Sequence, residues 1–168
     1  MQVKTCCFIG HRDVPDRSEV YSRVKKVIEN LIVNENVKVF HFGSRSAFDD
    51  ICHEIVTAFQ EKYPDIRRIN YKDYDGAMMS DRLWSAGKAS YVERNQDMID
   101  ASDFCIFYYN PCYLPSKRKW SKRSLGEYQP NSGTKIAFDY ANQRKRGGKE
   151  ITIINLCKDI DNEIAENK

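Results

Sequence analysis

The chain alternates short apolar runs with segments of helical spacing, and this alternation restricts its fold more than any other feature. The runs are rich in β-branched and aromatic residues, as strands are: Val3–Ile9, Val37–Phe42, Ile66–Tyr71, Phe104–Tyr109 and Ile151–Leu156. The segments between them carry apolar residues three and four positions apart, as amphipathic helices do. We therefore predict an α/β fold, a single Rossmann-like domain with a mainly parallel sheet of about five strands flanked by helices.

Length and charge narrow the class of protein. A chain of 168 residues allows one domain with a substantial core, which we assign to residues 1–157, followed by a polar C-terminal tail, 158–168. The 27 basic and 24 acidic residues nearly balance, so the excess of positive charge typical of non-specific nucleic-acid binders is missing. The sequence shows neither a signal-peptide pattern nor an apolar run of ~20 residues, which predicts a cytoplasmic protein outside the membrane.

The cysteines and histidines show no metal-binding spacing. Six cysteines are present, most of them within apolar runs, and no CxxC pair is matched by a second pair. We interpret them as reduced, mostly buried thiols rather than as disulfide partners or metal ligands. His41 and His53 are interpreted as structural, since no HExxH or Cys/His pattern surrounds them.

Helix starts and loops follow from capping residues, glycines and prolines. Asp49 stands three residues after Ser46, the spacing of a capping box. In all we expect helices after Asp16, after Ser46, from about Ser90 to Asp100, and after Ser132. Two stretches lack strand or helix patterns, and we predict that both Lys72–Lys88 and Asn110–Asn131 are loops or lids.

Candidate ligand-binding residues follow the predicted strands. In open parallel sheets, ligands bind beyond the carboxyl ends of the strands, where the strand order reverses. With a strand order of 3-2-1-4-5, the first and fourth strands are neighbours and their loops face one crevice. The segments expected there are Gly10-His11-Arg12, Gly43-Ser44-Arg45-Ser46, Tyr109 and the helix start Ser132-Gly133-Thr134.

These residue types suit an anionic ligand. Glycine lets a ligand approach the backbone, and the free N–H groups of a helix start attract phosphate, so Ser132–Thr134 is a candidate phosphate cradle. Arg45 adds a bidentate donor. The alternative for each segment is an ordinary helix cap or strand-end turn, and His11 has no evident nucleophile or orienting acid that would make it catalytic.

A basic segment gives a further alternative. Lys117–Arg123 contains five cations and Trp120, a combination that can follow a sugar-phosphate backbone. A solvated loop is the commoner explanation for such a run, so we rank nucleic-acid binding last among the candidate functions.

Taken together, these segments resemble the YpsA-like branch of the SLOG superfamily, a Rossmann-like group that also includes Lonely Guy phosphoribohydrolases and DprA-type DNA-processing proteins. The likeness spans most of the chain, through Cys6–Arg12, Phe42–Ser46, Tyr91–Asn95 and Ser132–Thr134. The resemblance implies a domain that binds a nucleotide or a nucleotide-derived small molecule. It implies that the Gly-His-Arg turn and the Ser-Gly-Thr helix start line the site, and we expect Glu93, Arg94 and Asn95 to bind the ligand as well.

The resemblance to the Lonely Guy enzymes is incomplete. Arg94, within Glu93-Arg94-Asn95, matches an arginine that supports N-glycosidic cleavage in those enzymes, but Ala137 stands where they carry a glutamate. Because alanine can neither transfer a proton nor stabilise a developing positive charge, we expect ligand binding or sensing rather than that hydrolysis. A hydrolase that recruits a different acid or base is the first alternative, and the candidates for that group are Glu93, Asp49, Asp139 and His11. Apart from the nucleotide-derived ligand, the sequence indicates no cofactor. It leaves open whether two copies of the chain associate.

Overall fold

A computed structural model describes residues 2–43, 46–71, 90–113, 119–121, 126–128 and 132–157 of the chain. The main sheet and its helices are, in chain order, β1 (Lys4–Gly10), α1 (Arg17–Glu35), β2 (Val37–Phe42), α2 (Ala47–Lys62), β3 (Arg67–Asn70), α4 (Ser90–Asp100), β4 (Phe104–Tyr108), α5 (Gly133–Arg146) and β7 (Thr152–Asn155). Each strand lies within one or two residues of its predicted bounds. The predicted α/β class is confirmed.

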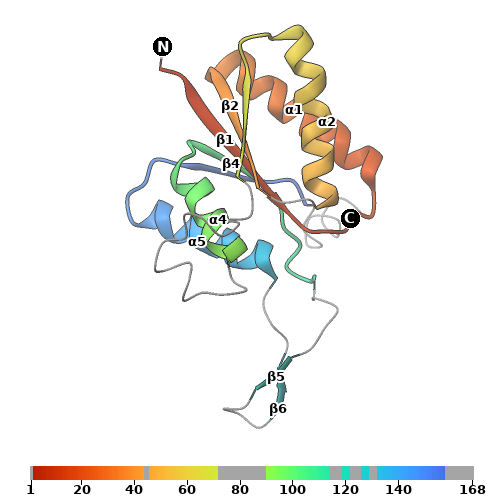
Figure 1. Ribbon diagram of the computed structural model, residues 1–168, viewed down its shortest axis with the longest axis vertical. Coiled ribbons are helices and arrows are strands. Elements are labelled where there is room, and N and C mark those ends of the chain that lie inside the picture. The colour runs from red at the N-terminus through yellow and green to blue at the C-terminus, as the bar shows by residue number, and fades with distance from the viewer. Residues whose placement is uncertain are drawn as a thin grey trace, which may run out of the picture.

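The five strands form one parallel sheet in the order β3-β2-β1-β4-β7. It matches the 3-2-1-4-5 order that a crevice between the first and fourth strands requires. The chain moves outward from β1 through β2 to β3, and then returns to the other side of β1 to form β4 and β7 (Figure 1). The direction of winding therefore reverses between β1 and β4, and the carboxyl ends of these two neighbours define the switch point of the sheet.

Helices cover both faces of the sheet (Figure 1). Helices α1 and α2 pack on one face through their buried apolar residues, which meet Phe8, Phe40 and Phe42 of the strands. Helices α4 and α5 cover the other face, where Met98, Ile99, Ala137 and Ala141 meet alternate residues of β1 and β4. The two-residue period of the strands accounts for this division, because successive side chains point to opposite faces.

The helix starts agree with the capping signals in the sequence. Asp16 caps α1 by accepting a hydrogen bond from the Glu19 N–H, and Ser46 and Asp49 form a capping box at α2. Ser132 caps α5 through its hydroxyl, which accepts from the Lys135 N–H. Because the strands are parallel and alternate with helices, α2, α4 and α5 all begin at the carboxyl edge of the sheet.

Four of the six cysteines lie in the core as unpaired thiols. Cys6, Cys7, Cys52 and Cys105 are buried, and none of the six forms a disulfide. The Cys7 and Cys105 Sγ atoms are 3.0 Å apart across the register of β1 and β4. Burial raises the pKa of the Cys6, Cys52 and Cys105 thiols well above its usual range, which keeps them protonated. The predicted burial of most thiols is confirmed.

One loop prediction is wrong in part. Within Asn110–Asn131 the chain forms a short antiparallel hairpin of β5 (Lys119–Ser121) and β6 (Gly126–Tyr128), which Figure 1 shows apart from the main sheet. Three-residue strands are too short to produce a readable alternation, and the neighbouring prolines favoured a loop. Lys72–Lys88, most of Lys117–Arg123 and the tail 158–168 lie outside the described residues.

No helix in the described part of the chain is both long enough and apolar enough to cross a membrane.

Candidate functional site

Most of the polar residues that the fold buries gather at the carboxyl edge of the sheet. Nine buried residues among those described are polar or charged. Seven of them follow β1, cap a helix, or lie in the first two turns of α2, α4 or α5: His11, Ser46, Asp49, Arg94, Asn95, Ser132 and Thr134. All but Asp49 were predicted as ligand-binding residues. Burial of a polar group costs free energy unless the group forms hydrogen bonds within the protein or with a ligand. This concentration of buried polar groups therefore marks the edge as the candidate site.

The turn after β1 is packed tightly against α2. A side chain at Gly10 would overlap the Phe48 ring, so only glycine lets the end of β1 approach the first turn of α2. The Ala47 N–H donates a 3.1 Å hydrogen bond to the Arg12 carbonyl, which ties the same turn to the helix start. The Arg12 side chain is exposed. Gly10–Arg12 and Ser46 are thus brought together, as predicted.

His11 is buried beneath aromatic neighbours rather than presented to solvent. Its Nε2 accepts a 2.9 Å hydrogen bond from the Asn110 N–H, and its ring stacks on Tyr113 with a centroid separation of 4.1 Å. Burial lowers the pKa of His11, so the imidazole is neutral at pH 7, with its proton on Nδ1 and Nε2 left to accept from Asn110. His11 therefore holds the loop after β4 in place.

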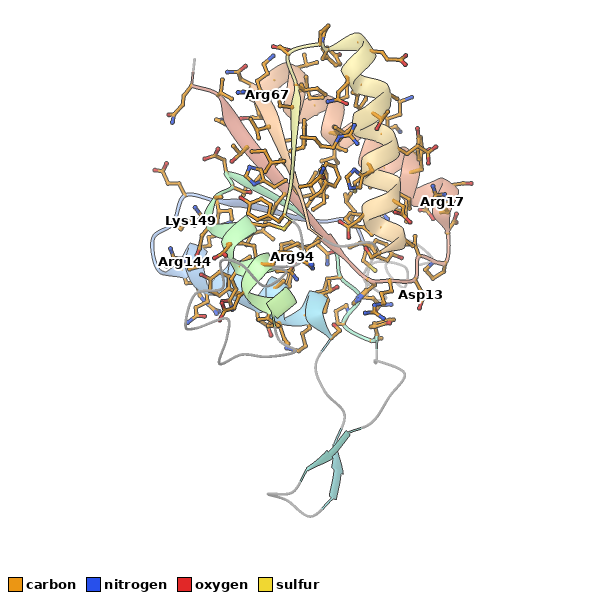
Figure 2. The ribbon with its side chains drawn as sticks, in the orientation of Figure 1. Asp13, Arg17, Arg67, Arg94, Arg144 and Lys149 are labelled. Carbon is orange, nitrogen blue, oxygen red and sulfur yellow. The ribbon has the colours of Figure 1, made fainter. Side chains whose placement is uncertain are left out.

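The end of β2 is packed against α4 in the same manner. A Cβ at Gly43 would lie 2.8 Å from the Arg94 Nε, so the absence of a side chain lets Arg94 lie across the strand end. Figure 2 shows Arg94 directed from α4 toward the strands, inside the molecule, whereas Arg17 and Arg144 lie on the outside. A guanidinium that is 5% exposed needs negative charge or carbonyl groups around it.

Asp49 supplies negative charge close to Arg94. Its Oδ2 accepts a 2.7 Å hydrogen bond from the Ser46 hydroxyl, while its Oδ1 has no hydrogen-bond partner among the described residues. Burial raises the pKa of the Asp49 carboxyl to about 6, against the opposing effects of the Ser46 hydrogen bonds and the Arg94 charge. The sequence indicated Asp49 only as a capping residue and as one of several acids that a hydrolase might recruit. Its place beside Arg94 depends on the packing of α4.

The start of α5 is suited to an anion. Ser132 and Thr134 are buried and Gly133 is half-buried. The Ser132 hydroxyl accepts a 3.0 Å hydrogen bond from the Lys135 N–H, and the first turn contains no acidic residue. The first turns of α1, α2 and α4 each carry at least one carboxylate. An acid-free helix start retains the positive end of the helix dipole for a ligand. Ala137, one turn further on, is buried in the core.

Tyr109 links the end of β4 to strand β7 and to helix α5. Its N–H and C=O form 3.0 Å hydrogen bonds with the side-chain amide of Asn155 at the end of β7. Its ring lies 4.7 Å, between centroids, from that of Phe138 in α5. No sequence pattern pointed to Asn155, because the residue lies near the end of an ordinary apolar run.

The remaining predicted site residues are distributed as follows. Glu93 and Asn95 flank Arg94 on α4, with Asn95 buried and Glu93 half-buried. Ser44 and Arg45 lie outside the described residues. Among those described, no three histidine, cysteine or acidic side chains gather in a way that could hold a metal ion.

Two surface hollows lie between paired helices, and none of the nine buried polar residues lines either of them. One, of about 440 Å³, is lined by residues of α4 and α5, including Gln96, Tyr140 and Arg146. The other, of about 400 Å³, is lined by Arg17, Glu54 and other residues of α1 and α2. Both are bordered by exposed side chains on the outer surfaces of helix pairs, and neither contains a predicted ligand-binding residue.

Fold and site together define a Rossmann-like α/β domain with a buried polar cluster at the switch point of its parallel sheet. Comparison of the chain with protein-family models and with curated proteins finds no match.

Proposed function

We propose that this protein binds a nucleotide-derived small molecule at the carboxyl edge of its sheet, with the ligand's phosphate at the start of α5. The observation that carries the proposal is the concentration of buried polar side chains at this edge, next to the switch point between β1 and β4. Ligands of doubly wound sheets bind at this position. The resemblance of Gly10–Arg12 and Ser132–Thr134 to YpsA-like SLOG proteins points to the same ligand class.

Electrostatics favours α5 over the other helix starts as the phosphate site. At α2, the carboxylate of Asp49 already occupies the capping box, and Asp50 adds a second acid in the first turn. At α5, no described residue accepts a hydrogen bond from the backbone N–H groups of Gly133 and Thr134, because the Ser132 hydroxyl accepts from the Lys135 N–H instead. A phosphate there would complete the hydrogen bonding that every helix start requires.

Hydrolysis of an N-glycosidic bond is a second candidate, favoured by one observation. Asp49 has a pKa of about 6, near the value that suits proton transfer at neutral pH. Ala137 argues against the Lonely Guy mechanism, and Asp49 is fully buried, so binding without turnover is the first choice. Incubation with nucleoside monophosphates, followed by detection of free base, separates the two candidates.

The test of the binding proposal places a charge at the start of α5. We expect Gly133→Asp to lower the affinity for nucleoside monophosphates and for inorganic phosphate by at least about tenfold, through repulsion of the phosphate. The matched control is Gly133→Asn, which has nearly the same size and no charge. The aspartate variant should melt no lower than the asparagine variant, since an acid in the first turn favours the helix.

Calorimetric titration of the wild type and both variants decides the proposal. A larger loss in Gly133→Asp than in Gly133→Asn, with folding intact, supports a phosphate at this helix start. Equal affinities in the two variants would mean that the helix start only caps α5. Absence of binding by the wild type across a panel of purine and pyrimidine monophosphates would overturn the proposed function.

A further inference from the structure

The turn that follows β4 is held rigidly at the proposed site. The Tyr113 N–H donates a 3.0 Å hydrogen bond to the Asn110 carbonyl, and the Cys112 N–H donates to the Asn110 side chain at 2.9 Å. The Asn110 N–H in turn donates to the Nε2 of His11, which belongs to the neighbouring strand end. Local bonds thus fix the shape of the turn, and the bond to His11 fixes its place on the sheet.

This turn lays an aromatic ring on the switch point. The rings of Tyr113 and His11 are stacked, with an interplanar angle of 26°. His11 also borders Tyr109, whose ring contacts Phe138 in the second turn of α5. A row of aromatic rings therefore runs from the turn to the helix that holds the proposed phosphate position.

Tyr113 differs from the other rings of this row in its burial and its hydrogen bonds. His11 is buried and accepts the hydrogen bond from Asn110, and Tyr109 is anchored to Asn155 through its backbone. Tyr113 is half-buried as a residue, and its ring stacks on that of His11. An aromatic ring that is held on one face by a neighbouring ring can stack on a planar ligand with its other face.

We infer that Tyr113 is a specificity-determining residue whose ring stacks on the nucleobase of the ligand, so that the site selects nucleotides over sugar phosphates. The inference rests on the proposed function and extends it, since a phosphate at α5 alone would not distinguish a nucleotide from its ribose 5-phosphate part. Every base offers a flat face, so stacking on tyrosine favours nucleotides as a class. His11 serves as the support that keeps the tyrosine ring in place.

The test compares nucleoside monophosphates with ribose 5-phosphate, both measured by calorimetric titration. The wild type should bind the nucleotide at least about tenfold more tightly than the sugar phosphate. Tyr113→Leu should lower nucleotide affinity about tenfold, the equivalent of ~1.4 kcal/mol, and leave ribose 5-phosphate affinity unchanged. Tyr113→Phe keeps the ring and should bind both as the wild type does. Tyr21→Leu, on α1 at the opposite face, is the matched control and should change neither affinity.

The outcomes separate this inference from the proposed function. If Tyr113→Leu binds the nucleotide as tightly as the wild type does, the inference is overturned while the phosphate site stands. If the wild type binds the nucleotide and the sugar phosphate with equal affinity, the inference is overturned as well. This measurement needs no substitution, so it decides the inference even if a variant does not fold. If neither compound nor inorganic phosphate binds the wild type, the proposed function fails as well.

Discussion

At the scale of single residues, Asp49 is the most perturbed acid that the structure describes. It is fully buried at the start of α2, with one oxygen bonded to Ser46 and with Arg94 nearby. Desolvation raises its pKa from 3.8 to about 6, so the folded state binds its proton more tightly than the unfolded state does. The stabilisation from this group is therefore complete at low pH and is lost as the pH rises through about 6.

Asp49→Asn should remove this pH dependence. Relative to the wild type, the free energy of unfolding of the variant should increase between about pH 4 and pH 7, by up to about 3 kcal/mol at ~1.4 kcal/mol per pKa unit. Urea unfolding at a series of pH values measures the difference. Comparison of the two proteins cancels the histidines, whose lowered pKa values act in the opposite direction. A difference that stays constant with pH would show that Asp49 titrates normally.

At the scale of elements, the serines that cap α2 and α5 differ in the hydrogen bonds that they form. Both serines accept a hydrogen bond from the N–H three residues on, at 3.1 Å for Ser46 and 3.0 Å for Ser132. Ser46 also donates from its hydroxyl to a buried carboxylate, that of Asp49, whereas no described carboxylate accepts from Ser132. Removal of the Ser46 hydroxyl would leave the Asp49 carboxylate less well satisfied inside the protein.

We therefore expect Ser46→Ala to destabilise the protein more than Ser132→Ala. The loss of an ordinary cap costs about 1 kcal/mol, which we expect for Ser132→Ala. For Ser46→Ala we expect about 2–3 kcal/mol, because a hydrogen bond to a buried charged group is lost in addition. Chemical unfolding near neutral pH, where Asp49 is ionised, measures both values. Equal losses would contradict the coupling of the α2 cap to Asp49.

At the scale of the whole molecule, the sheet should be most stable at its centre. Strands β1 and β4 each pair with two neighbours and are covered by helices on both faces, whereas β3 and β7 each pair with one strand of the sheet. Amide hydrogen exchange should therefore be slowest in β1 and β4 and faster in β3, whose residues are mostly exposed. Mass spectrometry of exchanged peptides measures this order. Protection of β3 equal to that of β1 would show that the edge is covered in solution.

The sequence by itself determined the strands and helices of the main sheet, their order along the chain and the edge to which the candidate residues belong. Strand runs and helix starts are local signals, carried by the period of apolar residues and by caps such as Asp16 and Ser132. Once strands and helices alternate, physical rules on crossovers leave few arrangements of the sheet. Gly10, Gly43 and Ser132–Thr134 could be assigned to one edge because each follows a strand or opens a helix.

Only the tertiary structure decided which side chains meet at that edge. Asn110 and His11 are 99 positions apart in the chain, and Tyr109 and Asn155 are 46 apart, so no local pattern could pair them. The contact of Arg94 with Gly43 depends on how α4 packs on the sheet, and the stacking of Tyr113 on His11 depends on a turn after β4. Periodicity assigns a residue to a face or an edge, but its partners depend on how the helices and loops pack there, because those contacts join segments that are distant in sequence.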